Sequence, residues 1–553
     1  MNTSDSAPQR LLLIGLDGAT FDILRPLMQM GCLPRLARLM EEGSHGPLLS
    51  TIPPLTAPAW STFHTGVNPG KHGVFDFFQT TAEGSQRGGV VNSGSVRCLP
   101  FWHYLGQAGK RVGLVNVPMT YPPQPIHGFV VSGMPAPLRP RNFTYPPELA
   151  ERLPDYKIDL PYFLGGREFQ AEYVPAANRL LKDLGTLMQL RGEHTLRLMR
   201  EEPWDVLMVV FTETDRVGHF LWASLEKLVQ GEVEKQLELT LVAWFMALDD
   251  LIGRLVAEAG AAALTLVISD HGMGPSATRR FYVNDWLLQE GFLSLRRHAW
   301  TNPNTWLRGL GISRDAAARL LSLLPRRLVG ALRSKVGRID VPVDNSRSRA
   351  YLQPIYEFVA GIRLVDGSLS DKSEGLLREL TESLLSVIAP ETGDRVVDKV
   401  YRREEAYHGP YVSESPHLIA ILNPDFVANH RVGNKALVGG RREISGAAMV
   451  AGAHRFEGIL IAHGPGIKKQ SRPHFGFRLQ DISPSVLHLM RLPVPDHMDG
   501  RVLQEVIEAG LLEQRPVQYV STDLPGPVGG GPGLTAREEA EVRRQLKGLG
   551  YLS

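Results

Sequence analysis

Short, continuous apolar runs recur along the chain, and each ends in glycine or a polar residue. Continuous rather than alternating hydrophobicity is typical of strands that are covered on both faces, as in a parallel sheet. We interpret seven such runs as strands, namely Leu11–Leu16, Val112–Val117, Phe129–Val131, Val206–Phe211, Leu264–Ile268, His417–Leu422 and Ile459–Ala462.

Patterns with helical periodicity lie between these runs. Alternation of strand and helix predicts an α/β fold, with a doubly wound, mostly parallel central sheet and helices on both faces. The expected helices cover Pro34–Glu42, Ala177–Glu202, Glu232–Ala259, Lys372–Ile388 and Ser483–Met490.

Two stretches fit this rhythm poorly, and we expect them to be cap segments inserted into one α/β domain that spans residues 11–525. Residues 133–176 are rich in proline and aromatic residues, and residues 275–450 hold few sheet-like runs. Glycine and proline at 526–534 predict a flexible linker. The last segment, 535–553, should form a charged helix over Thr535–Lys547, with Gly548 placed to end it.

Composition narrows the function classes. The 553 residues are 43% hydrophobic with a net charge of +2, which excludes wholesale disorder and gives no reason to expect nucleic acid. With only two cysteines, Cys32 and Cys98, a disulfide framework and a thiolate zinc ribbon are excluded. Any metal must therefore be held by nitrogen and oxygen. A basic stretch, 279–349, could attract an anionic substrate, although such runs are more often solvated surface.

No apolar run approaches the roughly 20 residues that a membrane-spanning helix needs. The polar segment Met1–Arg10 and the short run behind it do not make a secretory signal, which needs about 7–15 apolar residues. We therefore expect a soluble, cytoplasmic protein.

Candidate metal ligands follow the predicted strands, and in open α/β sheets ligands bind at the carboxyl ends of the strands. Asp and His together, without thiolate, suit zinc, or manganese as a harder choice. Three carboxylates and three imidazoles exceed what one tetrahedral ion needs, so two divalent ions are expected. The six residues are Asp17, Asp215, His219, Asp270, His271 and His454.

A nucleophile could come from Thr56, which stands before a run, Ala59–Gly66, that could begin a helix. A hydroxyl that is bound to a divalent ion at a helix N-terminus loses its proton more readily. The simpler interpretation is that this threonine only caps the helix.

In this order the residues resemble the alkaline phosphatase superfamily, and most closely its type I phosphodiesterase/nucleotide pyrophosphatase family. That family shows L-D-G, then T-x-P with T-G and H-G, then D-x-x-x-H, D-H-G-M and G-x-H. The corresponding segments are Leu16–Gly18, Thr56–Pro58 with Thr65–Gly66 and His72–Gly73, Asp215–His219, Asp270–Met273 and Gly452–His454.

The resemblance implies two zinc sites, one formed by Asp215, His219 and His454 and the other by Asp17, Asp270, His271 and the oxygen of Thr56. It also implies hydrolysis of phosphodiester or phosphoanhydride bonds, of nucleotide type, in a small anionic phosphorylated substrate. Thr56 would attack phosphorus in line and form a phospho-threonine intermediate.

One departure leaves the substrate open. The nucleotide pyrophosphatases place an asparagine shortly after the H-G pair to hold a phosphate oxygen, whereas this chain reads Val74-Phe75-Asp76-Phe77. A phosphomonoesterase therefore remains an alternative, and a non-catalytic phosphate-binding module is a more distant one. His463 is an alternative ligand to His454, while His64, His72 and His417 are interpreted as core or loop residues.

Overall fold

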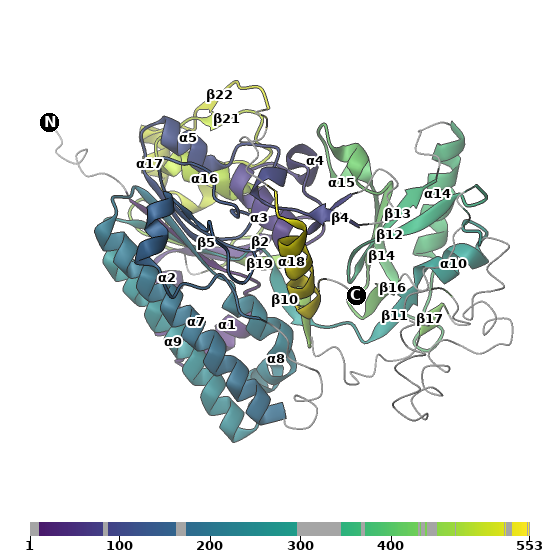
Figure 1. The fold of residues 1–553 in the computed structure, drawn as a ribbon, viewed down its shortest axis with the longest axis horizontal. Helices are drawn as coiled ribbons and strands as arrows, with labels where there is room; N and C mark the ends of the chain where they lie inside the picture. The colour runs from purple at the N-terminus through teal and green to yellow at the C-terminus, as the bar shows by residue number, and fades with distance from the viewer. Residues whose placement is uncertain are drawn as a thin grey trace.

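The computed structural model describes residues 10–80, 87–161, 173–295, 344, 346–365, 371–429, 432, 437–439, 451–470, 472–524, 526, 533–549 and 551. Its centre is a nine-stranded sheet (Figure 1). In spatial order the strands are β20 (Phe477–Arg478), β2 (Ser44–Leu49), β19 (Glu457–His463), β9 (Leu264–Ile268), β1 (Leu11–Leu16), β8 (Val206–Phe211), β5 (Val112–Val117), β6 (Gly128–Ser132) and β7 (Thr144–Tyr145).

The middle of this sheet is parallel. β1 pairs in parallel with β8 and with β9, and β5 pairs in parallel with β8 and with β6. β19 runs antiparallel to β9 and β2. Every residue of β1, β8 and β9 is buried, which explains why their sequences are apolar without alternation.

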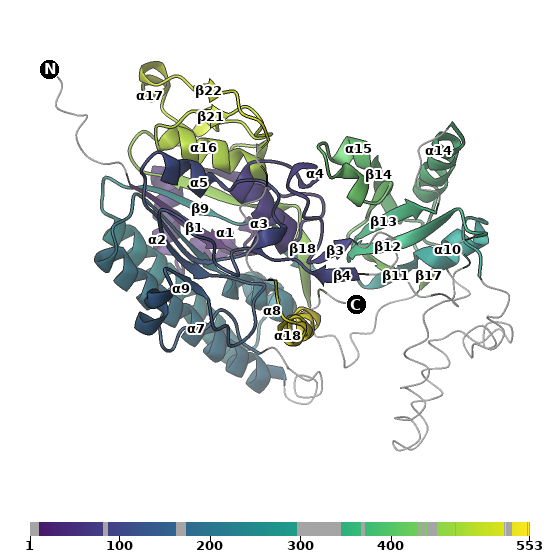
Figure 2. The ribbon, with the colours of Figure 1, turned by 45° about the horizontal axis from the view of Figure 1, so that its top comes forward.

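Helices cover both faces of the sheet, as Figures 1 and 2 show. One face packs Leu12, Ile14 and Leu16 of β1 against α1 (Phe21–Gln29), α2 (Pro34–Glu42), α7 (Tyr173–Glu201), α8 (Glu213–Gln230) and α9 (Lys235–Ala259). The other face packs Leu11 and Leu13 against α3 (Thr56–Thr65), α5 (Phe101–Gln107) and α16 (Ile482–Leu489). The doubly wound arrangement predicted from the sequence is confirmed.

Two smaller sheets lie to one side of the central sheet in both views. One has the order β12 (Ala350–Tyr356), β13 (Val359–Leu364), β15 (Leu418–Leu422), β14 (Val397–Arg402), and the other has the order β16 (Phe426–Asn429), β11 (Arg279–Tyr282), β17 (Val438–Gly439). α10 (Val283–Gln289), α14 (Asp371–Leu385) and α15 (Arg403–Ala406) accompany them. Both sheets come from the stretch 275–450 that we expect to be an insertion.

The remaining elements are short except for the last helix. They are α4 (Pro69–His72), β3 (Phe78–Thr80), β4 (Arg87–Val90), η1 (Ser93–Ser95), η2 (Pro147–Arg152), β10 (Gly272–Pro275), η4 (Val412–Glu414), β18 (Gly452–Arg455), η5 (Leu479–Asp481), β21 (Val494–Pro495), η6 (Gln504–Val506), α17 (Ala509–Gln514), β22 (Tyr519–Val520) and α18 (Ala536–Gly548). None of the described helices is long and apolar enough to cross a membrane.

The structure corrects two expectations. The predicted strand His417–Leu422 does form, as β15, but it belongs to a small sheet and not to the central one. Gly548 does not end the last helix, because α18 includes it and is capped by Leu549. Most of the linker 526–534 and most of the basic stretch 279–349 lie outside the described residues.

Candidate active site

The carboxyl ends of β8, β1 and β9 bring the candidate ligands together. Asp17 follows β1, and Asp270 and His271 follow β9. α8 begins directly behind β8, so Asp215 and His219 lie one turn apart on the same side of that helix. Because the three strands are parallel neighbours, these residues meet at one edge of the sheet.

His454 reaches this edge from the other direction. It lies on β18, which pairs antiparallel with β10, and it is the register partner of Met273. The backbone N–H of Ala451 donates to the carbonyl of His219 over 2.7 Å, which ties β18 to α8. The pairing of β18 with β10 and this hydrogen bond therefore place His454 beside Asp215 and His219 of α8.

Asp215, His219 and His454 form the first cluster of possible metal ligands. Nε2 of His219 lies 2.9 Å from Nε2 of His454, and the Oδ1 atom of Asp215 lies 3.3 Å and 3.2 Å from these two nitrogens. Asp17, Asp270 and His271 form the second cluster, in which Nε2 of His271 lies 3.5 Å from Oδ1 of Asp17 and 3.3 Å from Oδ2 of Asp270. The rings of His271 and His454 stack with centroids 3.5 Å apart, so the two clusters adjoin.

All three histidines present the same nitrogen to the clusters. Nδ1 of His219 donates to the carbonyl of Gly452 over 3.0 Å, Nδ1 of His454 donates to Pro54 over 2.8 Å, and Nδ1 of His271 donates to Gly272 over 3.0 Å. A hydrogen on Nδ1 leaves Nε2 with its lone pair, which is how ligating histidines are held by a backbone carbonyl.

The three candidate carboxylate ligands are also suited to bind cations. One oxygen of each, Oδ1 of Asp17, Oδ1 of Asp215 and Oδ2 of Asp270, is buried without a hydrogen-bond donor among the described residues. Burial, followed by the charge of Asp215, raises the pKa of Asp17 to about 7. Burial, followed by the charge of Asp17, holds the pKa of Asp270 well above its usual range. Three carboxylates crowded in a dry site are costly unless cations neutralise them.

Gly18 allows the clusters to lie this close. Its φ is +67°, and a Cβ atom there would lie 3.1 Å from Oδ1 of Asp215 and 3.1 Å from Cε of Met273. A side chain at this turn would be strained by its backbone conformation and would press on a candidate ligand. A glycine at position 18 therefore allows both the turn and the close packing of the candidate ligands.

Thr56 lies at the second cluster. It is the first residue of α3, while Leu55 is the N-cap residue, so the threonine side chain does not cap the helix. Its Oγ1 atom lies 3.4 Å from Nε2 of His271. The hydroxyl thus stands at a helix N-terminus beside a candidate metal ligand, where both the helix dipole and a bound cation would favour its ionised form.

The structure brings all seven sequence-predicted site residues together, and each is at most 2% exposed. His463 lies elsewhere, at the end of β19, with Nε2 3.5 Å from Oε2 of Glu42. His72 contacts Oγ1 of Thr62 over 2.9 Å and His417 accepts from the N–H of Leu364 over 3.2 Å, which agrees with their interpretation as core or loop residues.

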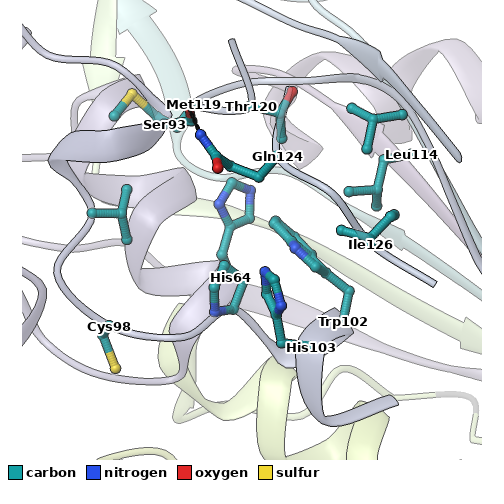
Figure 3. Close-up of a pocket in the computed structure, with 13 residues that line it drawn as sticks. His64, Ser93, Cys98, Trp102, His103, Leu114, Met119, Thr120, Gln124 and Ile126 are labelled. Carbon is teal, nitrogen blue, oxygen red and sulfur yellow. Dashed lines mark hydrogen bonds between the residues drawn. The ribbon is translucent and has the colours of Figure 1, made fainter. Parts of the chain in front are cut away.

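His64, in the last turn of α3, lines a cavity. Figure 3 shows it beside Trp102 and His103, with Leu114 and Gln124 further along the wall. None of the seven site residues lines this cavity. This cavity is therefore separate from the two clusters of candidate ligands.

Sequence reasoning missed two residues at the site. Arg216, which is 1% exposed, donates to Oδ2 of Asp215 and, over 2.9 Å, to Oδ2 of Asp159. Tyr551, beyond α18, places its hydroxyl 3.3 Å from Oδ2 of Asp215 and 3.4 Å from Oγ1 of Thr56. Arg216 could have been noticed as the charged neighbour of a predicted ligand, whereas nothing in its local sequence marks Tyr551.

The chain was compared with known proteins. The sequence profile described as type I phosphodiesterase/nucleotide pyrophosphatase matches residues 11–454. A search of curated protein sequences finds no match. Among solved structures, phosphonoacetate hydrolase from Sinorhizobium meliloti, bound to phosphonoacetate, aligns with a TM-score of 0.52 and 15% identity, over 88% of this chain and 95% of that chain.

Human ectonucleotide pyrophosphatase/phosphodiesterase 5 aligns with a TM-score of 0.49 and 15% identity, over 91% of this chain and 100% of that chain. The likeness to the phosphonoacetate hydrolase shows a shared fold, and the profile match covers most of the chain. The chain belongs to the type I phosphodiesterase/nucleotide pyrophosphatase family and is a hydrolase of phosphoric esters.

Proposed function

We propose that this protein hydrolyses phosphodiester or phosphoanhydride bonds of a small anionic substrate through a phospho-threonine intermediate on Thr56. The observation that carries the proposal is the position of the Thr56 hydroxyl, at the N-terminus of α3 and 3.4 Å from His271. In this family setting, a buried hydroxyl beside a cluster of candidate metal ligands has the environment of an activated nucleophile.

The residues favour zinc. Asp215, His219 and His454 would hold one ion, and Asp17, Asp270, His271 and the Thr56 oxygen would hold the other. Carboxylate and imidazole donors in groups of three suit zinc, and manganese is the harder alternative. When bound, two such ions supply charge stabilisation for the attacking and leaving oxygens of an in-line displacement.

The formal charges agree with this arrangement. Three ligand carboxylates contribute −3, two divalent ions contribute +4, and the adjoining Arg216–Asp159 ion pair adds no net charge, which leaves +1 while the Thr56 hydroxyl is neutral and zero when it is ionised. A net positive site also attracts an anionic phosphate ester. With both ions bound, the site would therefore favour both the ionised threonine and the anionic substrate.

The chain's own residues would act in two steps. In the first, Thr56 Oγ1 gives up its proton and forms a bond to phosphorus, the bond from phosphorus to the leaving oxygen breaks, and the leaving oxygen takes up a proton. In the second, water attacks phosphorus, the bond to Thr56 breaks, and the threonine hydroxyl regains its proton. A phosphodiester and water thus give a phosphomonoester and an alcohol.

Comparing two aryl substrates tests the proposal. With zinc supplied, we expect a bis-aryl phosphate diester to be cleaved with a higher kcat/KM than the aryl phosphate monoester, and Thr56→Ala to lower kcat for the diester by roughly 10³-fold or more. Thr65→Ala is the matched control, because Thr65 lies on the same helix and its hydroxyl only donates to the carbonyl of Ser61 over 2.7 Å.

The outcomes separate the alternatives. Preference for the monoester would make the protein a phosphomonoesterase. Turnover of neither ester, with phosphate binding retained, would indicate a phosphate-binding module. Full diesterase activity in Thr56→Ala would refute the nucleophile.

A further inference from the structure

Tyr551 enters the active site from a segment far along the chain. α18 packs on β4, and the side chain of Arg543 on this helix donates to the carbonyl of Gly88 and stacks 4.8 Å over the ring of Phe78. The Oε1 atom of Glu541 accepts from the N–H of Leu138 over 2.8 Å. In Figures 1 and 2 the helix runs along the side of the central sheet near α8.

These contacts hold the Tyr551 ring in one place. Its backbone N–H donates to the carbonyl of Leu546 over 2.9 Å, and its side chain is part of the hydrophobic core with 5% of the residue exposed. The ring packs 4.8 Å from Phe77 and meets the rings of His219 and His454 at 5.7 Å. This packing of the ring fixes where the hydroxyl lies, beside Asp215 and Thr56.

The hydroxyl has three polar neighbours and no strong bond to any of them. It lies 3.4 Å from Oγ1 of Thr56, 3.3 Å from Oδ2 of Asp215 and 3.4 Å from Nη1 of Arg216. Hydrogen bonds between oxygens are strongest near 2.7–2.8 Å. A buried hydroxyl that makes only long contacts can form a stronger hydrogen bond when a closer acceptor enters the site.

Tyr551 is also the neutral side-chain donor within hydrogen-bond distance of the Thr56 hydroxyl in the part of the chain that the structure describes. Among the described residues, the side chains within hydrogen-bond distance of Oγ1 of Thr56 are those of His271 and Tyr551. His271 already donates through Nδ1 to Gly272 and turns its Nε2 lone pair toward the cluster. An oxygen on the reacting phosphorus could therefore accept a hydrogen bond from the Tyr551 hydroxyl but not from Nε2 of His271.

We propose that Tyr551 binds the substrate by donating its phenolic hydrogen to a non-bridging phosphoryl oxygen as Thr56 attacks. This inference rests on the proposed function. The negative charge on that oxygen makes the hydrogen bond a charge-assisted one. α18 is then part of the active site, because it delivers a substrate-binding residue.

The competing interpretation is that Tyr551 plugs the site. A side chain that blocks the site needs bulk, and short hydrogen bonds to the groups that it covers would hold it in place most firmly. The three contacts at 3.3–3.4 Å do not have that character. When the whole ring is removed, as in Tyr551→Ala, the two interpretations predict opposite changes in activity.

The test uses the full chain with zinc and the substitution Tyr551→Phe, which keeps the ring and removes the hydroxyl. We expect kcat/KM for the diester to fall about 10- to 100-fold, mainly through kcat, the usual cost of losing a hydrogen bond to a charged group. The affinity for orthovanadate, measured by isothermal titration calorimetry, should fall with it, while zinc content stays the same. Tyr519→Phe is the matched control, because Tyr519 is exposed on β22.

Tyr551→Ala completes the test, since it should lose at least as much activity as Tyr551→Phe. A rise in activity in either variant would show a plug and overturn the inference. Unchanged kinetics and vanadate affinity in Tyr551→Phe, or a loss that tracks loss of zinc, would overturn it as well. A parent chain that binds vanadate but cleaves no ester would contradict the proposed function, while the vanadate comparison would still decide the role of Tyr551.

Discussion

The chemistry of the site depends on how a few side chains are oriented by their neighbours. Each candidate histidine ligand donates from Nδ1 to a backbone carbonyl, and each candidate carboxylate keeps one buried oxygen without a donor among the described residues. These features could not be read from the sequence, which shows residue types but not hydrogen-bond directions. The ligand types themselves could be predicted, because aspartate follows three of the apolar runs, twice with a histidine, and ligands of open α/β sheets bind at the carboxyl ends of the strands.

Asp270→Asn tests a single ligand. The substitution keeps the shape of the side chain but removes the charge from the second cluster, where Oδ2 lies 3.3 Å from Nε2 of His271. We expect the zinc content, measured by elemental analysis after dialysis, to fall from two equivalents to about one, since an ion that loses an anionic ligand is held far less tightly. Asp22→Asn, on an exposed residue in the first turn of α1, is the control. Two equivalents retained in Asp270→Asn would remove Asp270 from the ligand set.

At the scale of elements, continuous apolar runs located the strands of the central sheet, and β1, β5, β8 and β9 begin and end at the predicted residues. β12 and β13 were missed because polar residues, Gln353 and Arg363, interrupt their apolar runs. Gly548 was expected to end the last helix. The helix includes Gly548 because Leu549 and Tyr551 are buried behind it, and this packing outweighs the low helix propensity of one glycine.

A buried ion pair holds the start of α8. Arg191 on α7 donates to Glu213, two residues before Asp215, and both side chains are fully buried. Removing one partner leaves a charge without compensation in the interior, which costs about 3–5 kcal/mol. Glu213→Ala should therefore lower the free energy of unfolding by that amount in urea denaturation.

The surface pair Arg38–Glu42 provides the contrast, because both side chains are largely exposed. Glu42→Ala should change the unfolding free energy little. An equally small effect of Glu213→Ala would mean that the buried pair does not hold α8 in place.

At the scale of the whole molecule, the site is assembled from segments that lie as far apart as Asp17 and Tyr551. The strand order explains most of that convergence, because β8, β1 and β9 are neighbours although they are distant in sequence. The sequence indicated that such a sheet exists, but it could not show that the segment after α18 returns to the nucleophile. That contact depends on side-chain packing against β4 and on Phe77, which leaves no periodic pattern in the sequence.

Trapping the covalent intermediate tests the central claim most directly. Acid quenching during turnover of an aryl phosphate diester, followed by proteolysis and mass spectrometry, should find the aryl phosphoryl group on the peptide that contains Thr56 and on the Thr56 oxygen within it. The same peptide should carry no modification in Thr56→Ala. Turnover at the full rate without any modified peptide, or with the phosphoryl group on another residue, would contradict the account.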